Sequence, residues 1–108
     1  MSAFFGPAGN SDSFSKAHKS SQAAPKWIRD FGLDCYEYQC GKGVHIGEES
    51  ARKLGQAAQA AGIRLSLHAP YFINLANPDP DALKKTIGYI ISACFAADCM
   101  GASRVVIH

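Results

Sequence analysis

The stretch EESARKLGQAAQAAGIRLSLH, residues 48–68, decides the fold class because it joins a helix signal directly to a strand signal. Two acidic residues open its helical part, where the positive end of the helix dipole favours them, and Gly62 is a typical helix stop. The sequence therefore predicts a helix over residues 48–61. Residues 63–68 alternate apolar and polar side chains, as expected of a strand with one buried face.

Upstream of this stretch the sequence predicts the same alternation of strand and helix. SAFFG at residues 2–6 has the pattern of a short strand that runs into a turn-rich segment. A helix is expected from an N-cap at Ser20 or Ser21 to about Phe31. DCYEYQC at residues 34–40 is rich in aromatic residues, which favours a strand.

Downstream, Asp79 and Pro80 are typical of the first residues of a helix, and Gly101 is typical of its end. The apolar stripe that this helix is expected to bury comprises Leu83, Ile87, Ile90, Ile91 and Cys94. SRVVIH at residues 103–108 completes the pattern as a fourth strand.

Short strands that alternate with helices pair in parallel through right-handed crossovers, which is the arrangement of α/β proteins. About four strands and three helices make the first half of a (β/α)8 TIM barrel, a fold that needs about 250 residues. We therefore expect residues 1–108 to form a single partial TIM-barrel domain, the N-terminal half of a larger fold, rather than a compact four-stranded domain.

Composition and charge exclude several classes of protein. The 108 residues, 11.5 kDa in mass, leave room for one domain. No apolar run approaches the roughly 20 residues that span a bilayer, so no membrane association is expected. The opening MSAFFGPAGN lacks the basic start and long apolar stretch of a signal peptide. The net charge of +2 permits nucleic-acid binding but is weaker than a dedicated basic footprint.

The four cysteines are Cys35, Cys40, Cys94 and Cys99. They form two pairs whose spacing is at the limit for zinc sites, and no histidine follows closely behind either pair. We therefore expect reduced, mostly buried thiols in a cytoplasmic protein.

Two predicted strands end alike, in Arg64-x-x-x-His68 and Arg104-x-x-x-His108. Residues four apart in a strand share a face, and in a barrel the polar face is the interior, where catalytic groups collect at the C-terminal rim. Neighbouring strand ends lie roughly 5 Å apart, so His68 and His108 are candidate ligands of a shared metal ion. The alternative, in which each histidine is a rim residue bonded to a loop carbonyl, stays open.

Glu37 alternates with two tyrosines and is expected to face the interior, opposite to their rings. A buried carboxylate needs a partner, and Arg64 on the adjacent strand is the predicted one. This favours a structural role for Glu37 over a ligand or acid–base role.

Tyr71 and Phe72 follow His68 in a loop at the predicted rim. Two interpretations stay open for these rings. They cover the top of the barrel, or they wedge beside an unstacked nucleic-acid base.

The segment HAPYFINLANP, residues 68–78, followed by VVIH at the end of the next strand, resembles the endonuclease IV family of apurinic/apyrimidinic endonucleases. FFGPAGNSDSF and APKWIRDFGLDCYEYQCGKGV look like a bacterial and archaeal branch of that family. The resemblance implies a DNA-repair hydrolase on a xylose-isomerase-like TIM barrel. Three zinc ions at its rim would cleave double-stranded DNA on the 5′ side of abasic sites in base excision repair. By position, His68 and His108 match two zinc-ligating histidines, and Tyr71 and Phe72 match rim residues that enter the duplex.

The family's remaining ligands, a set of Glu, Asp and His on later strands, would lie beyond residue 108, so we expect this chain alone to be inactive. Its two barrel edges would be unpaired, which favours self-association. Two other functions stay open. One is a sugar isomerase or epimerase on the related xylose-isomerase-like barrel, which would give Glu37 more weight. The other is an inactive, truncated half-barrel.

Overall fold

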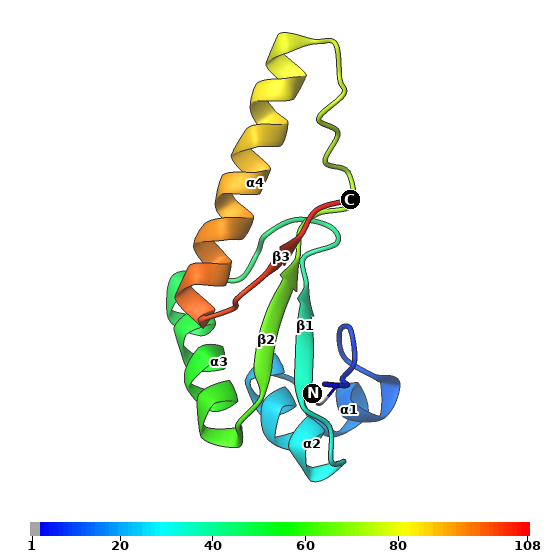
Figure 1. Ribbon diagram of the computed structural model, residues 1–108, viewed down its shortest axis with the longest axis vertical. Helices are drawn as coiled ribbons and strands as arrows, with labels where there is room; N and C mark the ends of the chain where they lie inside the picture. Colours follow the sequence, from blue (N-terminus) through cyan, green and yellow to red (C-terminus); the bar gives the residue numbers. More distant parts are fainter. Residues whose placement is uncertain (1–2) are drawn as a thin grey trace.

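The sheet has three parallel strands in the order β1-β2-β3. The computed structural model describes residues 3–108. The strands are β1 (Cys35–Gln39), β2 (Arg64–His68) and the short β3 (Val105–Val106), and all three end at the same edge (Figure 1). The parallel order and the helices between the strands agree with the predicted α/β class.

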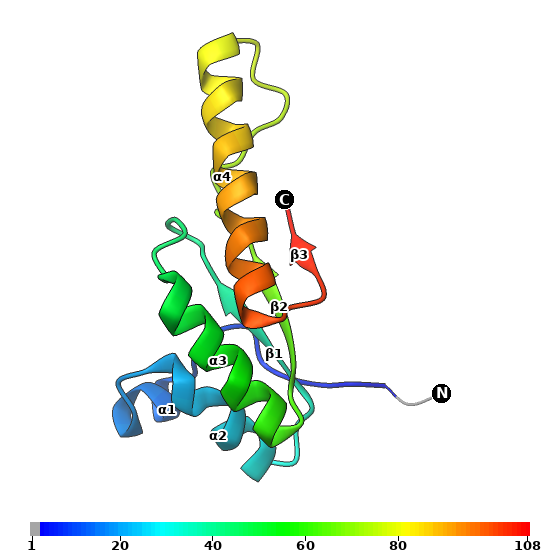
Figure 2. The ribbon, with the colours of Figure 1, turned by 90° about the vertical axis from the view of Figure 1, so that its left-hand side faces the viewer.

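The helices before and between the strands lie on one side of the sheet (Figure 2). They are α1 (Asp12–Ala17), the 3-10 turn η1 (Ser21–Ala23), α2 (Ala24–Asp30), α3 (Glu48–Ala61) and α4 (Pro80–Met100). The N-terminal half of α4 extends past the C-terminal edge of the sheet, beside the long segment that follows β2 (Figure 1 and Figure 2). None of the helices within residues 3–108 is both long and apolar enough to cross a membrane.

The stretch around α3 and β2 folds as its pattern predicts. α3 spans the predicted residues, and Gly62 ends it in the left-handed conformation with φ of 68°. In β2, Leu65 and Leu67 are buried against the helices, while Arg64 lies exposed on the opposite face. This alternation directs the polar side chains of β2 to the face that bears no helix.

The strand expected at residues 2–6 is displaced along the chain. Residue 2 lies outside the described residues, and the segment after it pairs with β1 through Phe5, Pro7 and Gly9. The carbonyl oxygen of Pro7 accepts from the amide of Glu37, and the amide of Gly9 donates to the carbonyl of Glu37. Proline has no N–H to donate, so the pairing reduces to an isolated bridge between Ala8 and Glu37 instead of a regular strand.

The helix expected up to Phe31 is divided. It starts as η1, which Ser20 caps by accepting from the amide of Gln22, and continues as α2 to Asp30. α1 was not predicted, because it lies in a segment expected to be a turn. Ser11 caps α1 by accepting from the amide of Phe14, whose ring is buried.

The apolar stripe expected on α4 is confirmed only in part, because Leu83 and Ile90 are half-buried and only Ile90 of the five packs against the core. Ile87 and Ile91 are exposed, as is Cys94. The residues that α4 buries are Thr86, Ala93, Ala96, Ala97, Cys99 and Met100. Small side chains let α4 approach α3 closely, and at the contact a Cβ placed on Gly55 would lie 2.5 Å from the carbonyl oxygen of Met100. Close backbone packing, rather than the largest side chains, therefore selects the buried face.

Candidate functional site

The imidazole rings of His68 and His108 meet at the C-terminal edge of the sheet. His68 is the last residue of β2 and is half-buried, while His108 lies beyond β3 and is exposed. Their ring centroids are 5.3 Å apart, with an angle of 32° between the ring planes. The structure thus brings together the two residues that the strand pattern predicts as candidate metal ligands.

The two histidines meet although their strands are staggered. Val106, not His108, is the register partner of His68. The two Arg-x-x-x-His motifs therefore do not lie side by side as expected, but are offset by two residues. A barrel requires such an offset between neighbouring strands because they tilt relative to its axis. His108 reaches His68 from one pleat further along its strand.

A short hydrogen bond determines which nitrogen of His68 is available to a ligand. Nδ1 of His68 lies 2.7 Å from the carbonyl oxygen of Ala69. A carbonyl can only accept, so Nδ1 carries the proton, and in the neutral ring Nε2 keeps its lone pair. This contact agrees with the alternative in which His68 is a rim residue bonded to a loop carbonyl. Metal-ligating histidines also commonly make this contact through the nitrogen that faces away from the metal.

The two imidazole rings at this edge are suitable zinc ligands, but two ligands are fewer than a zinc ion needs. Neutral imidazole is a common zinc ligand, and a structural or catalytic zinc ion has at least three protein ligands. Within residues 3–108, no three side chains from His, Cys, Asp and Glu cluster closely enough to hold a metal ion. His68 and His108 are therefore two donors of the kind that zinc binds, fewer than the three that a zinc site needs.

The ion pair expected between Glu37 and Arg64 is wrong. Nε2 of Gln39 donates to Oε1 of Glu37 at 2.6 Å, while the guanidinium of Arg64 lies 4.0 Å from the centre of the Phe4 ring. The register explains the difference, because Glu37 pairs with Ser66, two residues along the strand from Arg64. Glu37 stays half-buried on the sheet face that also bears His68.

The segment after β2 holds two aromatic rings out at the same edge. Tyr71 is 68% exposed and Phe72 is 41% exposed, and their rings meet edge to face at 5.6 Å. Phe72 also meets Tyr89 of α4 at 4.9 Å and 81°. We call Tyr71, Phe72 and Tyr89 the rim aromatic cluster. Tyr89 was not among the predicted site residues, because a single tyrosine outside the aliphatic stripe of a helix forms no motif.

The base of this loop is fixed to the fold. The amide of Ala69 donates to Val106, and the amide of Tyr71 donates to Gly41 in the segment after β1. Ala69 and Ile73 are buried on either side of the exposed rings. Tyr71 and Phe72 are therefore accessible to solvent on a loop whose base is held by backbone hydrogen bonds. Both interpretations of these rings, as a cover of the barrel and as a wedge beside a nucleic-acid base, stay predictions.

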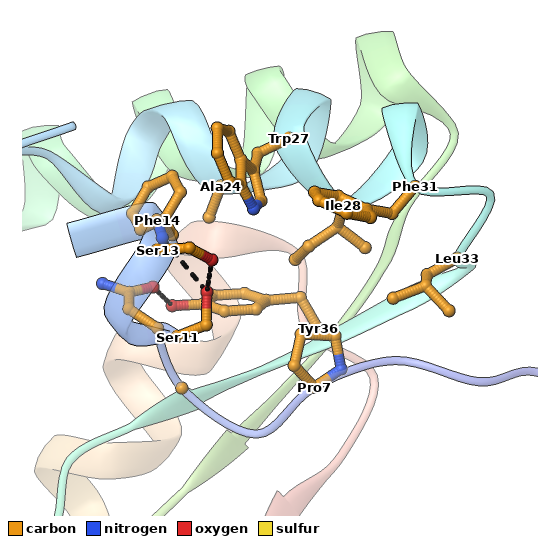
Figure 3. A pocket seen from close by; sticks show the side chains of 12 residues that line it. Pro7, Ser11, Ser13, Phe14, Ala24, Trp27, Ile28, Phe31, Leu33 and Tyr36 are labelled. Atoms are coloured by element: carbon orange, nitrogen blue, oxygen red, sulfur yellow. Dashed lines mark hydrogen bonds between the residues drawn. The ribbon is translucent and has the colours of Figure 1, made fainter. Parts of the chain in front are cut away.

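A separate cavity of about 270 Å³ lies on the helix-covered face of the sheet (Figure 3). Trp27 of α2 and Phe14 of α1 line it together with Tyr36 of β1. The hydroxyl of Tyr36 donates to Oδ1 of Asn10 at 2.6 Å, and burial raises the pKa of this phenol. Tyr36 alternates with Glu37, so the cavity opens on the face opposite to the histidine pair and is not part of that site.

All four cysteines are free, as predicted. Cys40 and Cys99 are buried, Cys35 is half-buried and Cys94 is exposed, so burial is less general than expected. Burial raises the pKa of the Cys40 thiol to about 11. This thiol is therefore neutral near pH 7, and within residues 3–108 it belongs to no cluster of candidate metal ligands.

Comparisons with known proteins agree on the fold. The family model described as "Xylose isomerase-like TIM barrel" matches residues 25–108. The crystal structure of D-psicose 3-epimerase in the presence of D-fructose is similar with a TM-score of 0.69, at 11% sequence identity, over 80% of this chain and 30% of that one. No curated protein sequence matches significantly. The predicted fold class, part of a TIM barrel, is confirmed, while the activity of an abasic-site endonuclease stays a prediction.

Proposed function

Because the chain belongs to the xylose isomerase-like TIM-barrel family, we propose that it is the N-terminal part of a zinc-dependent endonuclease that cleaves DNA on the 5′ side of abasic sites. The observation that carries this proposal is the His68–His108 pair, two imidazoles with centroids 5.3 Å apart at the carboxyl ends of adjacent strands. In TIM barrels this edge is where active sites lie.

Each proposed site residue has a defined task. His68, with Nδ1 bound to the backbone, would present Nε2 to the metal, and His108 would present its ring from the neighbouring strand. Zinc ions bound here would supply an activated water and stabilise charge on the attacking and leaving oxygens of the phosphodiester. Three ions are expected in the complete site, whose further Glu, Asp and His ligands would come from later strands.

Tyr71 and Phe72 would contact the double-stranded DNA substrate. Aromatic rings can stack on bases or enter the duplex between them, and such wedges help to deform DNA. An abasic nucleotide is easier to extrude than a paired one, because no base pair has to be broken. The exposure of both rings on an anchored loop supports this role.

A second candidate function is that of a sugar isomerase or epimerase, and Glu37 is the observation that favours it. Its carboxylate is half-buried on the face that bears His68 and is not neutralised by Arg64. Carboxylate and imidazole ligands together suit a single divalent metal that binds a small carbohydrate. The solved structure of D-psicose 3-epimerase, which has the same fold, makes this the alternative to test.

The test uses the full-length protein that contains this chain. With zinc supplied, we expect incision of a duplex that carries one abasic site, and no incision of the intact duplex. Replacing both Tyr71 and Phe72 with alanine should abolish binding to the abasic duplex. Leu75→Ala is the matched control, because Leu75 is an exposed apolar residue of the same segment. Absence of incision would refute the endonuclease. Unchanged DNA affinity together with turnover of a ketose would favour the sugar enzyme.

Two further proposals concern the cellular location of the protein and the association state of this chain. We propose that it acts in the cytoplasm, because its cysteines are free thiols. We also propose that the isolated 108-residue chain is inactive and self-associates through its sheet edges. Within the described residues, the outer edges of β3 and of the segment around Pro7 have no strand partner. Sedimentation that shows a folded, monodisperse monomer would contradict the second proposal.

A further inference from the structure

The ring of Phe72 lies between the two other rings of the rim aromatic cluster. It meets Tyr71 at 5.6 Å and 76°, and Tyr89 at 4.9 Å and 81°. Both angles are close to perpendicular, which is a favoured geometry because the positive edge of one ring approaches the negative face of the other. Because its ring has a neighbour on two sides, Phe72 is less exposed than Tyr71.

Tyr89 is the one ring of the cluster that belongs to a regular element. α4 begins at a capped N-terminus, where Asp79 accepts from the amide of Asp81, and it ends at Gly101 in the left-handed conformation. The C-terminal half of α4 is packed in the core, including Ala93 and Met100. Tyr89 lies in the helix between Thr86 and Ala93, which are both buried, so helical hydrogen bonds and these two contacts hold its backbone. Tyr71 and Phe72, by contrast, stand on an irregular loop.

From this arrangement we infer that Tyr89 is a positioning residue, which holds the Phe72 ring in the orientation in which it meets DNA. The inference rests on the proposed function and assigns to α4 a part in it. A ring that is ordered before binding loses less conformational entropy on the DNA than a free one. Tyr71, which lacks a helical neighbour in the cluster, is then the more mobile of the two loop rings.

The expected effect is of limited size. One edge-to-face contact between aromatic rings changes an equilibrium by about two- to tenfold. Tyr89→Ala should therefore weaken binding to an abasic duplex by about three- to tenfold and leave binding to an intact duplex unchanged. Tyr89→Phe keeps the ring edge and should bind as the wild type does.

The binding experiment uses the full-length protein and a duplex with a tetrahydrofuran abasic analogue beside 2-aminopurine, whose fluorescence reports base unstacking. Ile91→Ala is the matched control, an exposed apolar residue of α4 that lies outside the cluster. Circular dichroism checks that each variant is folded. If Tyr89→Ala is not, Tyr89→Leu replaces it, because leucine keeps apolar volume but has no aromatic edge.

A second measurement needs no DNA. With 4-fluorophenylalanine at position 72, the 19F resonance of the free protein should shift in Tyr89→Ala, because the ring current of Tyr89 is lost, and should stay in place in Ile91→Ala. Failure of the wild type to bind the abasic duplex would refute the proposed function. The role of Tyr89 would be refuted if the wild type binds the abasic duplex and Tyr89→Ala binds it equally well. A binding defect of the same size in Tyr89→Phe would also refute it, as would a 19F resonance that does not shift in Tyr89→Ala.

Discussion

His68 and His108 stand with their ring centroids 5.3 Å apart although they are not register partners. Val106 occupies the position opposite His68, and His108 approaches from one pleat beyond. The pair therefore depends on the stagger between β2 and β3 as well as on the two side chains. Because Nδ1 of His68 is bound to Ala69, the geometry leaves Nε2 as the atom of His68 that can bind a ligand.

The first prediction concerns zinc. In the full-length protein, His68→Ala and His108→Ala should each lower zinc content and abasic-site cleavage together, by at least about the 10–100-fold seen when ligand-supporting residues are removed. The double variant should be little worse than either single variant, because one remaining ring cannot hold the shared ion. Zinc per chain is measured by mass spectrometry and cleavage on an abasic duplex. Near-normal zinc occupancy with normal turnover in either single variant would contradict the assignment.

The second prediction concerns Arg29, which joins three parts of the fold. Its guanidinium donates to the carbonyls of Ala61 and Gly62 at the end of α3, at 3.0 and 2.6 Å, and lies 3.5 Å from Asp34 before β1. Arg29→Ala should lower the free energy of unfolding by about 1–2 kcal/mol, because two helix-end carbonyls lose a charged donor.

Lys26→Ala is the control for Arg29. Lys26 pairs with Asp30 at 3.0 Å on the same helix, but both side chains are mostly exposed. Exposed pairs of this kind contribute about 0–1 kcal/mol. Urea unfolding of both variants measures the difference, and equal losses of stability would show that the Arg29 contacts do not join these elements.

Local signals account for the parts of the fold that could be predicted from the sequence. The acidic start of α3, its glycine end and the alternation in β2 act within a few residues, and they give the element limits directly. The histidine pair was also predictable, because parallel strands bring their carboxyl ends to one edge. The stagger between β2 and β3, which places Val106 rather than His108 opposite His68, could not be predicted from the sequence.

The missed features depend on distant contacts. Glu37 and Arg64 fail to pair because the register sets them two residues apart. The buried face of α4 follows from how closely α3 can approach, which no periodicity within α4 reveals. Tyr89 joins the rim aromatic cluster only because the loop after β2 folds back along α4.

The third prediction compares two glycines in helices. In α3, a Cβ on Gly55 would lie 2.5 Å from the carbonyl oxygen of Met100, whereas a Cβ on Gly88 in α4 would meet nothing within 4 Å. Alanine favours a helix over glycine by about 1 kcal/mol. Gly88→Ala should therefore stabilise the protein by up to that amount, while Gly55→Ala should destabilise it by about 1–3 kcal/mol because the helices must move apart.

Chemical unfolding of the two variants tests this difference. The substitution is the same and both sites are helical, so the gain in helix propensity is the same in both variants. The difference between their free energies of unfolding therefore reports the contact between α3 and α4. A stabilised Gly55→Ala variant would mean that the two helices can separate without cost.

The fourth prediction concerns Cys40, whose burial raises the thiol pKa from 9.0 to about 11. At pH 8 an alkylating reagent should modify the exposed Cys94 and leave the buried Cys40 unreacted until the protein unfolds. The pKa is higher in the folded than in the unfolded chain, so the folded state holds the proton more tightly. The associated stability is present below about pH 9 and is lost as the pH rises to about 11, by at most about 2–3 kcal/mol.

Other groups titrate in the same range, including Tyr36 and Tyr38, whose pKa values burial also raises. The variant Cys40→Ala isolates the thiol, because it removes one titrating group and leaves both phenols. Its free energy of unfolding should fall less steeply between pH 9 and 11 than that of the wild type, although its stability at pH 7 is lower because a buried side chain is truncated. The prediction is contradicted if the free energy of unfolding depends on pH in the same way in both proteins, or if folded Cys40 is rapidly alkylated at pH 8. Either result would show that solvent reaches this thiol and that the end of β1, beside the histidine pair, opens in the native state.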